Sequence, residues 1–308
     1  MIRTLGIRSL AALGLWLVVI GFVLLFDTVV GKPEGSLVYL LAGFWLVLLL
    51  SFVALKNKEK NRQTLADLAI VFSVVFFFWE GLTAKWDVLD SFVFPSPATV
   101  LSTIGQDKGE ITDHIWASTK LLLTGYGLAV VAAISLGLYA GWNPRLHELI
   151  KPLASIASPI PPIVYIPYAI TLLPSFFLSS VFVIFVGAFW PILINTLNGV
   201  VHIEHRLIDS ARTLQLSPYT MFRRVLLPGA LPGIFAGASI GLVFAFILLT
   251  AAELIGATAG LGYYVKYHTD FGDFARVIVG IILIGAYVTI LMTLLQRFER
   301  YCLRWKQR

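Results

Sequence analysis

Long apolar segments alternate with short polar ones along the chain, and eight apolar segments are distinct. Residues within them are almost free of charge. About 20 apolar residues in a helix cross a hydrocarbon core of about 30 Å. The pattern therefore predicts an all-α, polytopic membrane protein with about eight transmembrane helices. The eight predicted spans are residues 10–26, 37–55, 65–79, 119–139, 152–173, 176–197, 229–252 and 277–295. Between the fourth and fifth spans, residues 142–151 are predicted to form a short loop.

The first apolar segment, residues 10–26, allows two interpretations. Arg3 and Arg8 precede it, as basic residues precede the apolar part of a secretory signal peptide. The tetrapeptide that follows, Asp27-Thr28-Val29-Val30, does not fit the small-residue cleavage site of such a peptide. We therefore expect a retained first transmembrane helix.

Charge and composition agree with a membrane protein. The chain is 58% hydrophobic and 13% charged, against about 25% charged residues in soluble domains. With both termini inside the cell, 17 of the 23 Lys and Arg residues lie in inner segments and six in outer ones. Because inner loops are enriched in Lys and Arg, this predicts an N-in/C-in topology. It also explains the net charge of +6 without a nucleic acid partner. The single cysteine, Cys302, excludes an intramolecular disulfide.

A polar, Arg-rich segment, residues 201–228, interrupts the apolar second half of the chain. Its apolar residues recur at helical spacing from Ile203 to Leu214. Ser217 and Pro218 then suit an N-cap and a first helical position. The segment predicts two short cytoplasmic helices with an elbow, the second running from Pro218 to about residue 227 and ending before Pro228. The alternative is an ordinary charged loop between spans.

The fifth apolar segment is rich in proline. Several prolines remove backbone donors within one span: Pro159, Pro161, Pro162 and Pro167. Irregular backbone at membrane depth persists only inside protein or beside a water-filled cavity. We expect this segment to face the interior of the helix bundle; the alternative is a kinked helix with a purely structural role.

Glu253 adjoins the seventh apolar segment. A carboxylate next to a span is costly and is a candidate functional residue. In the alternative interpretation it lies at the outer interface, where it is solvated or accepts hydrogen bonds from backbone amides.

Three glycines, Gly233, Gly237 and Gly241, recur every four residues on the same span. This spacing allows two helix backbones to approach closely. The stretch also matches the esterase pattern G-x-S-x-G through Ser239, but that pattern needs a strand before the serine. We expect helix packing here and no enzyme activity.

Metal and nucleotide sites are not indicated. His202 and His205 lie close in sequence but lack further ligands for zinc. His114 and His268 fall in outer segments, where we expect them to be solvated. The chain contains no G-x-x-x-x-G-K-[ST] loop, so we expect it to bind no cofactor and any ATP with Mg²⁺ to be bound by a separate subunit.

Several ordered motifs resemble one family. Asp209-Ser210-Ala211, Ser217-Pro218 and the Leu-Pro at residues 227–228 resemble the signature loop of the membrane subunits of bacterial ABC importers. Pro-Ile-Pro-Pro in the fifth span and the run from Thr250 to Tyr263 are similar to permeases for nitrate, sulfonates, taurine and bicarbonate. The chain departs from the family at Asp209 and Ser210, which replace Glu and Ala, and at Gln215, which replaces Gly. It departs again at residues 172–177, where a Gly-containing turn is usual.

The resemblance implies a type I ABC importer transmembrane fold. It implies that the segment 201–228 docks on an ATPase subunit through Asp209, Ser210, Ala211, Arg212, Gln215, Ser217, Pro218 and Pro228. It also implies that the fifth span lines the translocation path of a small solute, with an anion such as nitrate, bicarbonate, taurine or a sulfonate as the leading expectation. Residues 63–308 would form the permease core, and residues 1–62 would add two N-terminal helices and a basic loop.

The expected partners follow from the same resemblance. They are ABC ATPase subunits, a periplasmic or lipid-anchored substrate-binding protein, and a second permease copy in a homodimer. The expected location is the bacterial cytoplasmic (inner) membrane. An outer helix opened by Ser96 and Pro97 offers a docking place for the binding protein, which Lys substitutions at Asp107 and Glu110 would weaken.

Two other classes of protein are the alternatives. An ion-coupled secondary transporter commonly shows internal repeats and ionisable residues at mid-membrane. The chain has no clear repeat, and its spans are nearly free of charge. An intramembrane enzyme is disfavoured because no catalytic set accompanies Ser239.

Overall fold

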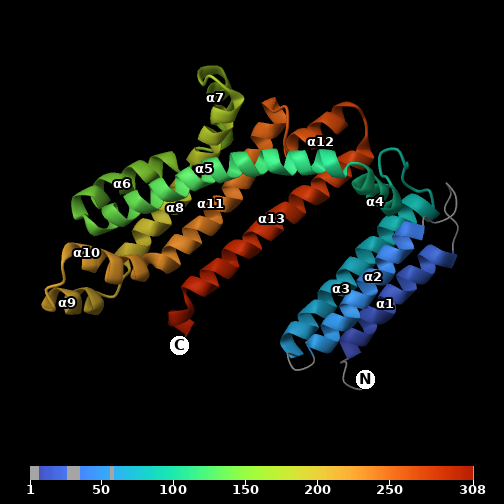
Figure 1. Cartoon of the computed structure of the whole chain (residues 1–308), viewed down its shortest axis with the longest axis horizontal. Helices are drawn as coiled ribbons and strands as arrows, with labels where there is room; N and C mark the ends of the chain where they lie inside the picture. Colours follow the sequence, from blue (N-terminus) through green and yellow to red (C-terminus); the bar gives the residue numbers. More distant parts are fainter. Residues whose placement is uncertain (1–6, 26–34, 56–58, 308) are drawn as a thin grey trace. The chain divides into compact units, whose positions relative to one another are not determined.

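The computed structural model describes residues 7–25, 35–55 and 59–307, and these residues are mostly helical with no strand among them. The chain forms two compact units (Figure 1). The first comprises Met1–Lys108 and His268–Val279; the second comprises Gly109–Tyr267 and Gly280–Arg308. The predicted all-α class is confirmed. The predicted domain boundary at residue 62 is not tested by this division and stays a prediction.

The first unit is built on three helices, α1 (Ile7–Leu25), α2 (Gly35–Ala54) and α3 (Glu59–Glu80). Their core uses small residues where α1 meets α3, which lets the backbones approach. The Trp16 indole lies in this core and donates a hydrogen bond to the Ala69 carbonyl at 3.2 Å. The indole N–H of this buried ring therefore has a hydrogen-bond acceptor.

A π-helical turn, Gly81–Lys85, follows α3, and α4 (Pro97–Gln106) completes this part of the unit. The Ser96 hydroxyl accepts a hydrogen bond from the Thr99 amide, and Pro97 occupies the first turn. This is the N-cap arrangement predicted from the Ser-Pro pair. The sequence prediction of a helix at this place is confirmed.

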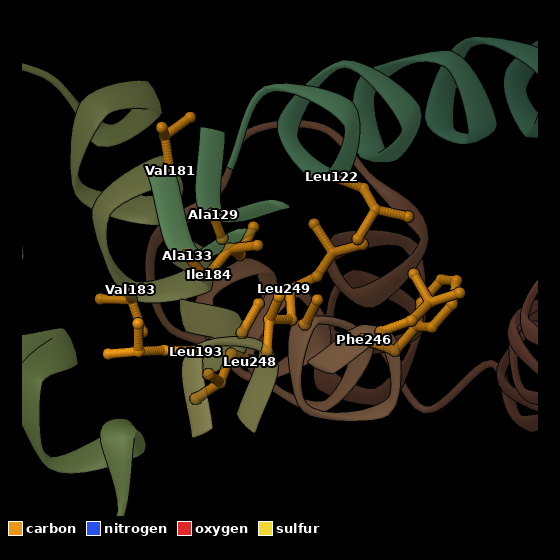
Figure 2. Close-up of a cluster of buried hydrophobic side chains, with 14 of the residues drawn as sticks. Leu122, Ala129, Ala133, Val181, Val183, Ile184, Leu193, Phe246, Leu248 and Leu249 are labelled. Atoms are coloured by element: carbon orange, nitrogen blue, oxygen red, sulfur yellow. The ribbon is translucent and has the colours of Figure 1, made fainter. Parts of the chain in front are cut away.

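The second unit holds most of the remaining helices. They are α5 (Lys108–Trp142), α6 (Pro144–Ala157), α7 (Ile166–Leu172), α8 (Phe176–Val201), α11 (Leu227–Gly256) and the larger parts of α12 (Leu261–Asp270) and α13 (Phe274–Cys302). Its main core joins α5, α8 and α11 (Figure 2). Alanines of α5 such as Ala129 and Ala133 lie against Ile184 of α8, while Leu248 and Leu249 enter from α11.

Six helices are long and apolar enough to cross a membrane, among the described residues. A seventh candidate is the pair Pro144–Ala157 and Pro162–Leu172, which is bent by 79° at the break between its helices. The described apolar part of α2, Leu41–Ala54, is shorter. Each of the eight predicted spans therefore coincides with a helix or, for the fifth, with a broken pair.

One predicted loop is wrong. Residues 142–151 were expected to form a loop, yet α6 begins at Pro144, directly after α5 ends at Trp142. The Asn143 side chain accepts a hydrogen bond from the Arg145 amide at 3.1 Å. An Asn-Pro pair is a helix start of the same kind as Ser-Pro, because it supplies both the cap and a residue without an amide hydrogen.

The glycine stripe of α11 packs on α8. A Cβ atom added at Gly233 would lie 2.7 Å from the Asn195 carbonyl oxygen, and one at Gly241 would lie 2.8 Å from Ile192. Gly199 of α8 packs against the glycine-containing face of α11. A Cβ atom added at Gly199 would lie 3.0 Å from the Ala230 carbonyl oxygen. Only glycine allows the two backbones this close approach.

Candidate functional site: the cytoplasmic segment and the broken span

The segment 201–228 forms two short helices with an elbow. The first, α9 (His205–Thr213), ends at Leu214, and the second, α10 (Pro218–Met221), begins after Ser217. The Ser217 hydroxyl accepts a hydrogen bond from the Thr220 amide. Between the helices, Gln215 has a φ of 48°. This left-handed conformation is the one for which glycine is favoured, and Gln adopts it at a cost.

The predicted end of the second helix before Pro228 is wrong. A π-helical turn, Phe222–Leu226, joins α10 to α11, so that one helical stretch runs from Pro218 to Gly256 over 39 residues. The wider turn changes the hydrogen-bond register just before Pro228, which lies in the first turn of α11. A proline without an amide hydrogen is tolerated there, since the regular ladder has already been interrupted.

One face of the segment is anchored to the membrane helices. Ala211, Met221 and Leu226 are buried together with Ile203 and with residues of α5, α8 and α11. The guanidinium of Arg212 lies 6.0 Å from the centre of the Trp142 ring, at the end of α5. This cation–π contact was not anticipated, because nothing in the sequence links residues 70 positions apart. These contacts attach the segment to the ends of α5, α8 and α11.

The exposed surface of the segment is polar but carries four large apolar side chains. Exposed fractions are 55% for Leu207, 73% for Leu214, 69% for Tyr219 and 40% for Phe222. Four arginines accompany these side chains on the same segment: Arg206, Arg212, Arg223 and Arg224. Apolar side chains gathered on the surface of a polar segment are typical of a protein-binding site, especially when polar residues surround them.

The prolines of the fifth span fall at the break between α6 and α7. Pro159 and Pro161 are exposed in the single chain, and Pro162 opens the 3-10 turn Pro162–Tyr165. Pro167 lies in the first turn of α7 and is also exposed. An exposed break in a span leaves backbone groups facing outward, so lipid alone does not satisfy this surface. Its predicted role in a translocation path stays a prediction.

Glu253 is buried, with an exposed fraction of 1%. Its carboxylate accepts hydrogen bonds from the Ser118 hydroxyl at 2.6 Å and from the Gly262 amide at 2.7 Å. Ser118 in turn accepts from the Leu261 amide at 2.8 Å. The side chain thus caps the start of α12, as one of the two sequence interpretations supposed.

The cap extends to a third residue. The His114 ring accepts a hydrogen bond from the Gly260 amide at 3.0 Å, and His114 is buried with an exposed fraction of 8%. The expectation that His114 and His268 are solvated is wrong, since His268 is equally buried. Gly260 has a φ of 129° and lies against the Glu253 carboxylate, so a side chain there would collide with it. Sequence reasoning missed Ser118 and His114, because their partners lie far along the chain.

An ion-pair cluster lies in the first unit. Arg276 binds Asp107 through Nε at 2.6 Å and Asp273 through a terminal nitrogen at 2.5 Å. Burial alone would raise the pKa of Asp273, but the hydrogen bonds and charge of Arg276 outweigh it and lower that pKa. Asp107 therefore ties α4 to the start of α13. Replacing it with Lys would disturb the fold and would not report cleanly on docking of a binding protein.

The described residues contain no group of three or more His, Cys, Asp or Glu side chains that could hold a metal ion. The site consists instead of an exposed cytoplasmic face and a broken membrane span on one helical scaffold. Both belong to the second unit.

Comparison with known proteins identifies a family of membrane transport subunits. Residues 129–304 match the family described as the binding-protein-dependent transport system inner membrane component. A probable ABC transporter permease protein of Brucella abortus (strain 2308) is 34% identical over 75% of this chain and 91% of its own length. The nitrate import permease protein of Synechocystis is 29% identical over 75% of this chain and 85% of its own length.

Structural comparison identifies the same architecture. A chain of the MetNI methionine ABC transporter, solved in inward-facing conformations, aligns with a TM-score of 0.55 at 20% identity. The alignment covers 64% of this chain and 98% of that chain. The protein is thus a multi-pass permease of the cytoplasmic membrane with an ABC importer fold. It belongs to the binding-protein-dependent transport system inner membrane component family.

Proposed function

We propose that this permease works in an ATP-driven importer whose ATPase subunits dock on the segment 201–228. The exposed apolar side chains of that segment carry the proposal. Leu214 and Tyr219 lie at the surface on either side of the Gln215 elbow, outside the apolar spans. A partner that covers them removes apolar surface from water, which supplies the main driving force for association.

The geometry also supports transmission of movement. Ala211 and Met221 bury the inner face of the segment against the helix bundle, and α10 continues without a gap into α11. A push on the elbow therefore acts on a stiff element that reaches across the membrane. ATP drives the cycle only because it binds one conformation of the assembly better than the other.

The proposed pore consists of two copies of the permease. The break around Pro159 and Pro161 is exposed in the single chain, and exposed irregular backbone requires protein or water beside it. A second copy related by a twofold axis would supply the opposite wall. A substrate-binding protein on the outer side would deliver the solute, which we propose to be a small anion by analogy with the nitrate import permease of Synechocystis.

Co-purification tests the docking face. The native chain should retain its ATPase subunit in detergent, and Leu214→Asp combined with Tyr219→Asp should lose it, because two charges would enter an apolar interface. Thr213→Asp with Glu204→Gln provides a control on the same polar segment, at exposed sites. Retention of the ATPase by the Leu214 and Tyr219 variant would contradict the proposal.

A further inference from the structure

A groove of about 570 Å³ lies between α6 and the C-terminal turns of α8. Volumes of this order hold small molecules in proteins. Its polar lining comes from both helices and consists of His147, Lys151, Ser155, Ser158, Asn198 and His202. The charge-based topology places this groove in the inner half of the membrane, next to the segment 201–228. Pro159 of the broken span lies at its edge.

The lining favours a negatively charged ligand. Lys151 is a cation, two imidazoles accompany it, and no acidic side chain is present among the described residues that line the groove. Lysine, serine, asparagine and histidine side chains all offer hydrogen-bond donors. The floor is apolar, since Ile150 and Leu197 are exposed by only 8% and 5%. An apolar floor strengthens electrostatic attraction above it.

One residue that lines the groove has a buried polar atom. The Nδ1 atom of His147 is buried and has no hydrogen-bond partner among the described residues. A buried polar atom of this kind is costly unless a ligand or water satisfies it. His202 is held in place on the other wall, where its Nδ1 donates to the Asn198 carbonyl at 2.7 Å. Because Nδ1 carries the proton of the neutral ring, Nε2 donates to an anion only in the imidazolium form.

We propose that the groove bounded by His147, Lys151 and His202 is an inner binding site for a small oxyanion. The substrate class rests on the proposed function, in which the permease carries a small anion. The site would hold the anion after it passes the break at Ser158 and Pro159 and before it enters the cytoplasm. Its far wall ends at His202, the second residue of the segment 201–228.

Histidine acylation tests the site on the purified full chain. Diethyl pyrocarbonate modifies accessible imidazoles, and mass spectrometry locates the products. Nitrate, bicarbonate and methanesulfonate serve as separate probes at constant ionic strength, in nanodiscs of phosphatidylcholine. We expect at least one of them to slow acylation of His147 and His202 severalfold. His205, exposed on α9 and outside the groove, is the internal control and should react at an unchanged rate.

Variants of Lys151 link protection to the cation. Lys151→Gln should lower the affinity for the protecting anion by about tenfold, since it removes a charge-assisted contact. Lys151→Arg should retain most of the protection. Arg145→Gln is the matched control, because Arg145 lies exposed on the same helix and does not line the groove. Should Lys151→Gln fail to assemble, the native protein and the Arg variant still decide the question.

Anionic lipid is the other source of an oxyanion at this depth. The experiment is therefore repeated in nanodiscs that contain phosphatidylglycerol. Protection by that lipid alone, with no effect of the three soluble anions, would overturn the proposal, as would equal protection of His205. The assay needs neither ATP nor a binding protein. Protection of His147 and His202 by an anion, without ATP-driven uptake, would refute the proposed function only. ATP-driven uptake without such protection would refute only this site.

Discussion

Two helix pairs of the second unit differ in how they use glycine and proline. Helices α8 and α11 approach so closely that a Cβ atom at Gly233 or Gly237 would lie within 2.8 Å of α8. Helices α6 and α7 are bent by 79° at a proline-rich break and leave Pro159 and Pro161 exposed. The first pair has the packing of a scaffold. The second has irregular backbone, which is tolerated at membrane depth only inside protein or beside a water-filled cavity.

From this contrast we infer that stability and transport depend on different helix pairs. Substitutions on the α8–α11 face should unfold the protein, and transport should fail only as a consequence. Substitutions at the break should leave stability almost unchanged and affect transport directly. The predictions below test that separation, in order of the expected effect on stability.

The largest effect is expected for Gly237→Val. Its Cβ would lie 2.8 Å from Asn195 Cβ and 3.0 Å from the Ile192 backbone, so the helices must separate. Overpacking of this severity costs about 3 kcal/mol or more. We expect little folded protein by size-exclusion chromatography in detergent. Gly127→Val, where an added Cβ meets nothing within 4 Å, is the control and should fold normally.

Glu253→Leu should have the next largest effect. The change leaves the Ser118 hydroxyl and the Gly262 amide without their acceptor in a buried place. An unsatisfied buried donor costs about 1–3 kcal/mol, so thermal unfolding should begin at a clearly lower temperature. Glu253→Gln retains a carbonyl oxygen and should lose less. Equal stability of the Leu variant and the native protein would refute the capping role.

Gln215→Gly should stabilise the protein slightly. The native φ of 48° is unfavourable for Gln, and glycine adopts it without strain. Glycine also raises the entropy of the unfolded chain, which offsets part of this gain. We expect a gain of about 0.5–1 kcal/mol, measured as a higher midpoint of thermal unfolding. Gln296→Gly in the exposed part of α13 is the control, and it should destabilise by about 1 kcal/mol. A loss at both positions would show that the elbow is not strained.

The smallest effect on stability is expected for Pro159→Ala combined with Pro161→Ala. Both side chains are exposed, and such substitutions usually change stability by less than about 0.5 kcal/mol. Uptake by the assembled transporter should nevertheless fall by about tenfold or more, because the break would regain helical hydrogen bonds. A large loss of stability with proportional loss of uptake would indicate a structural kink only.

Much of the architecture could be predicted because membrane helices carry a strong local signal. Apolar runs fixed the spans, and Ser217-Pro218 and Ser96-Pro97 gave correct helix starts. The same rule applied to Asn143-Pro144 would have predicted α6, and the loop expected there was an avoidable error. The helix through Pro228 was not predictable in this way, because a π-helical turn has no recognised sequence pattern.

The site was predicted less completely, for a physical reason. Ser118 and Glu253 are 135 residues apart, and His114 and Gly260 are 146 apart. Spacing along one helix says nothing about such contacts. The groove beside Lys151 depends likewise on two separate helices, α6 and α8. What could be predicted was residue type at a given depth, such as a carboxylate next to a span, and not its partners.

Uptake of a labelled anion into proteoliposomes tests the central claim most directly. The permease is reconstituted with its co-purified subunits and binding protein, with labelled nitrate, bicarbonate or taurine supplied in turn. We expect uptake that requires ATP hydrolysis and is abolished by Leu214→Asp with Tyr219→Asp, while the unfolding temperature stays unchanged. Uptake that proceeds without ATP and stops when ion gradients are dissipated would contradict the account and identify an ion-coupled transporter.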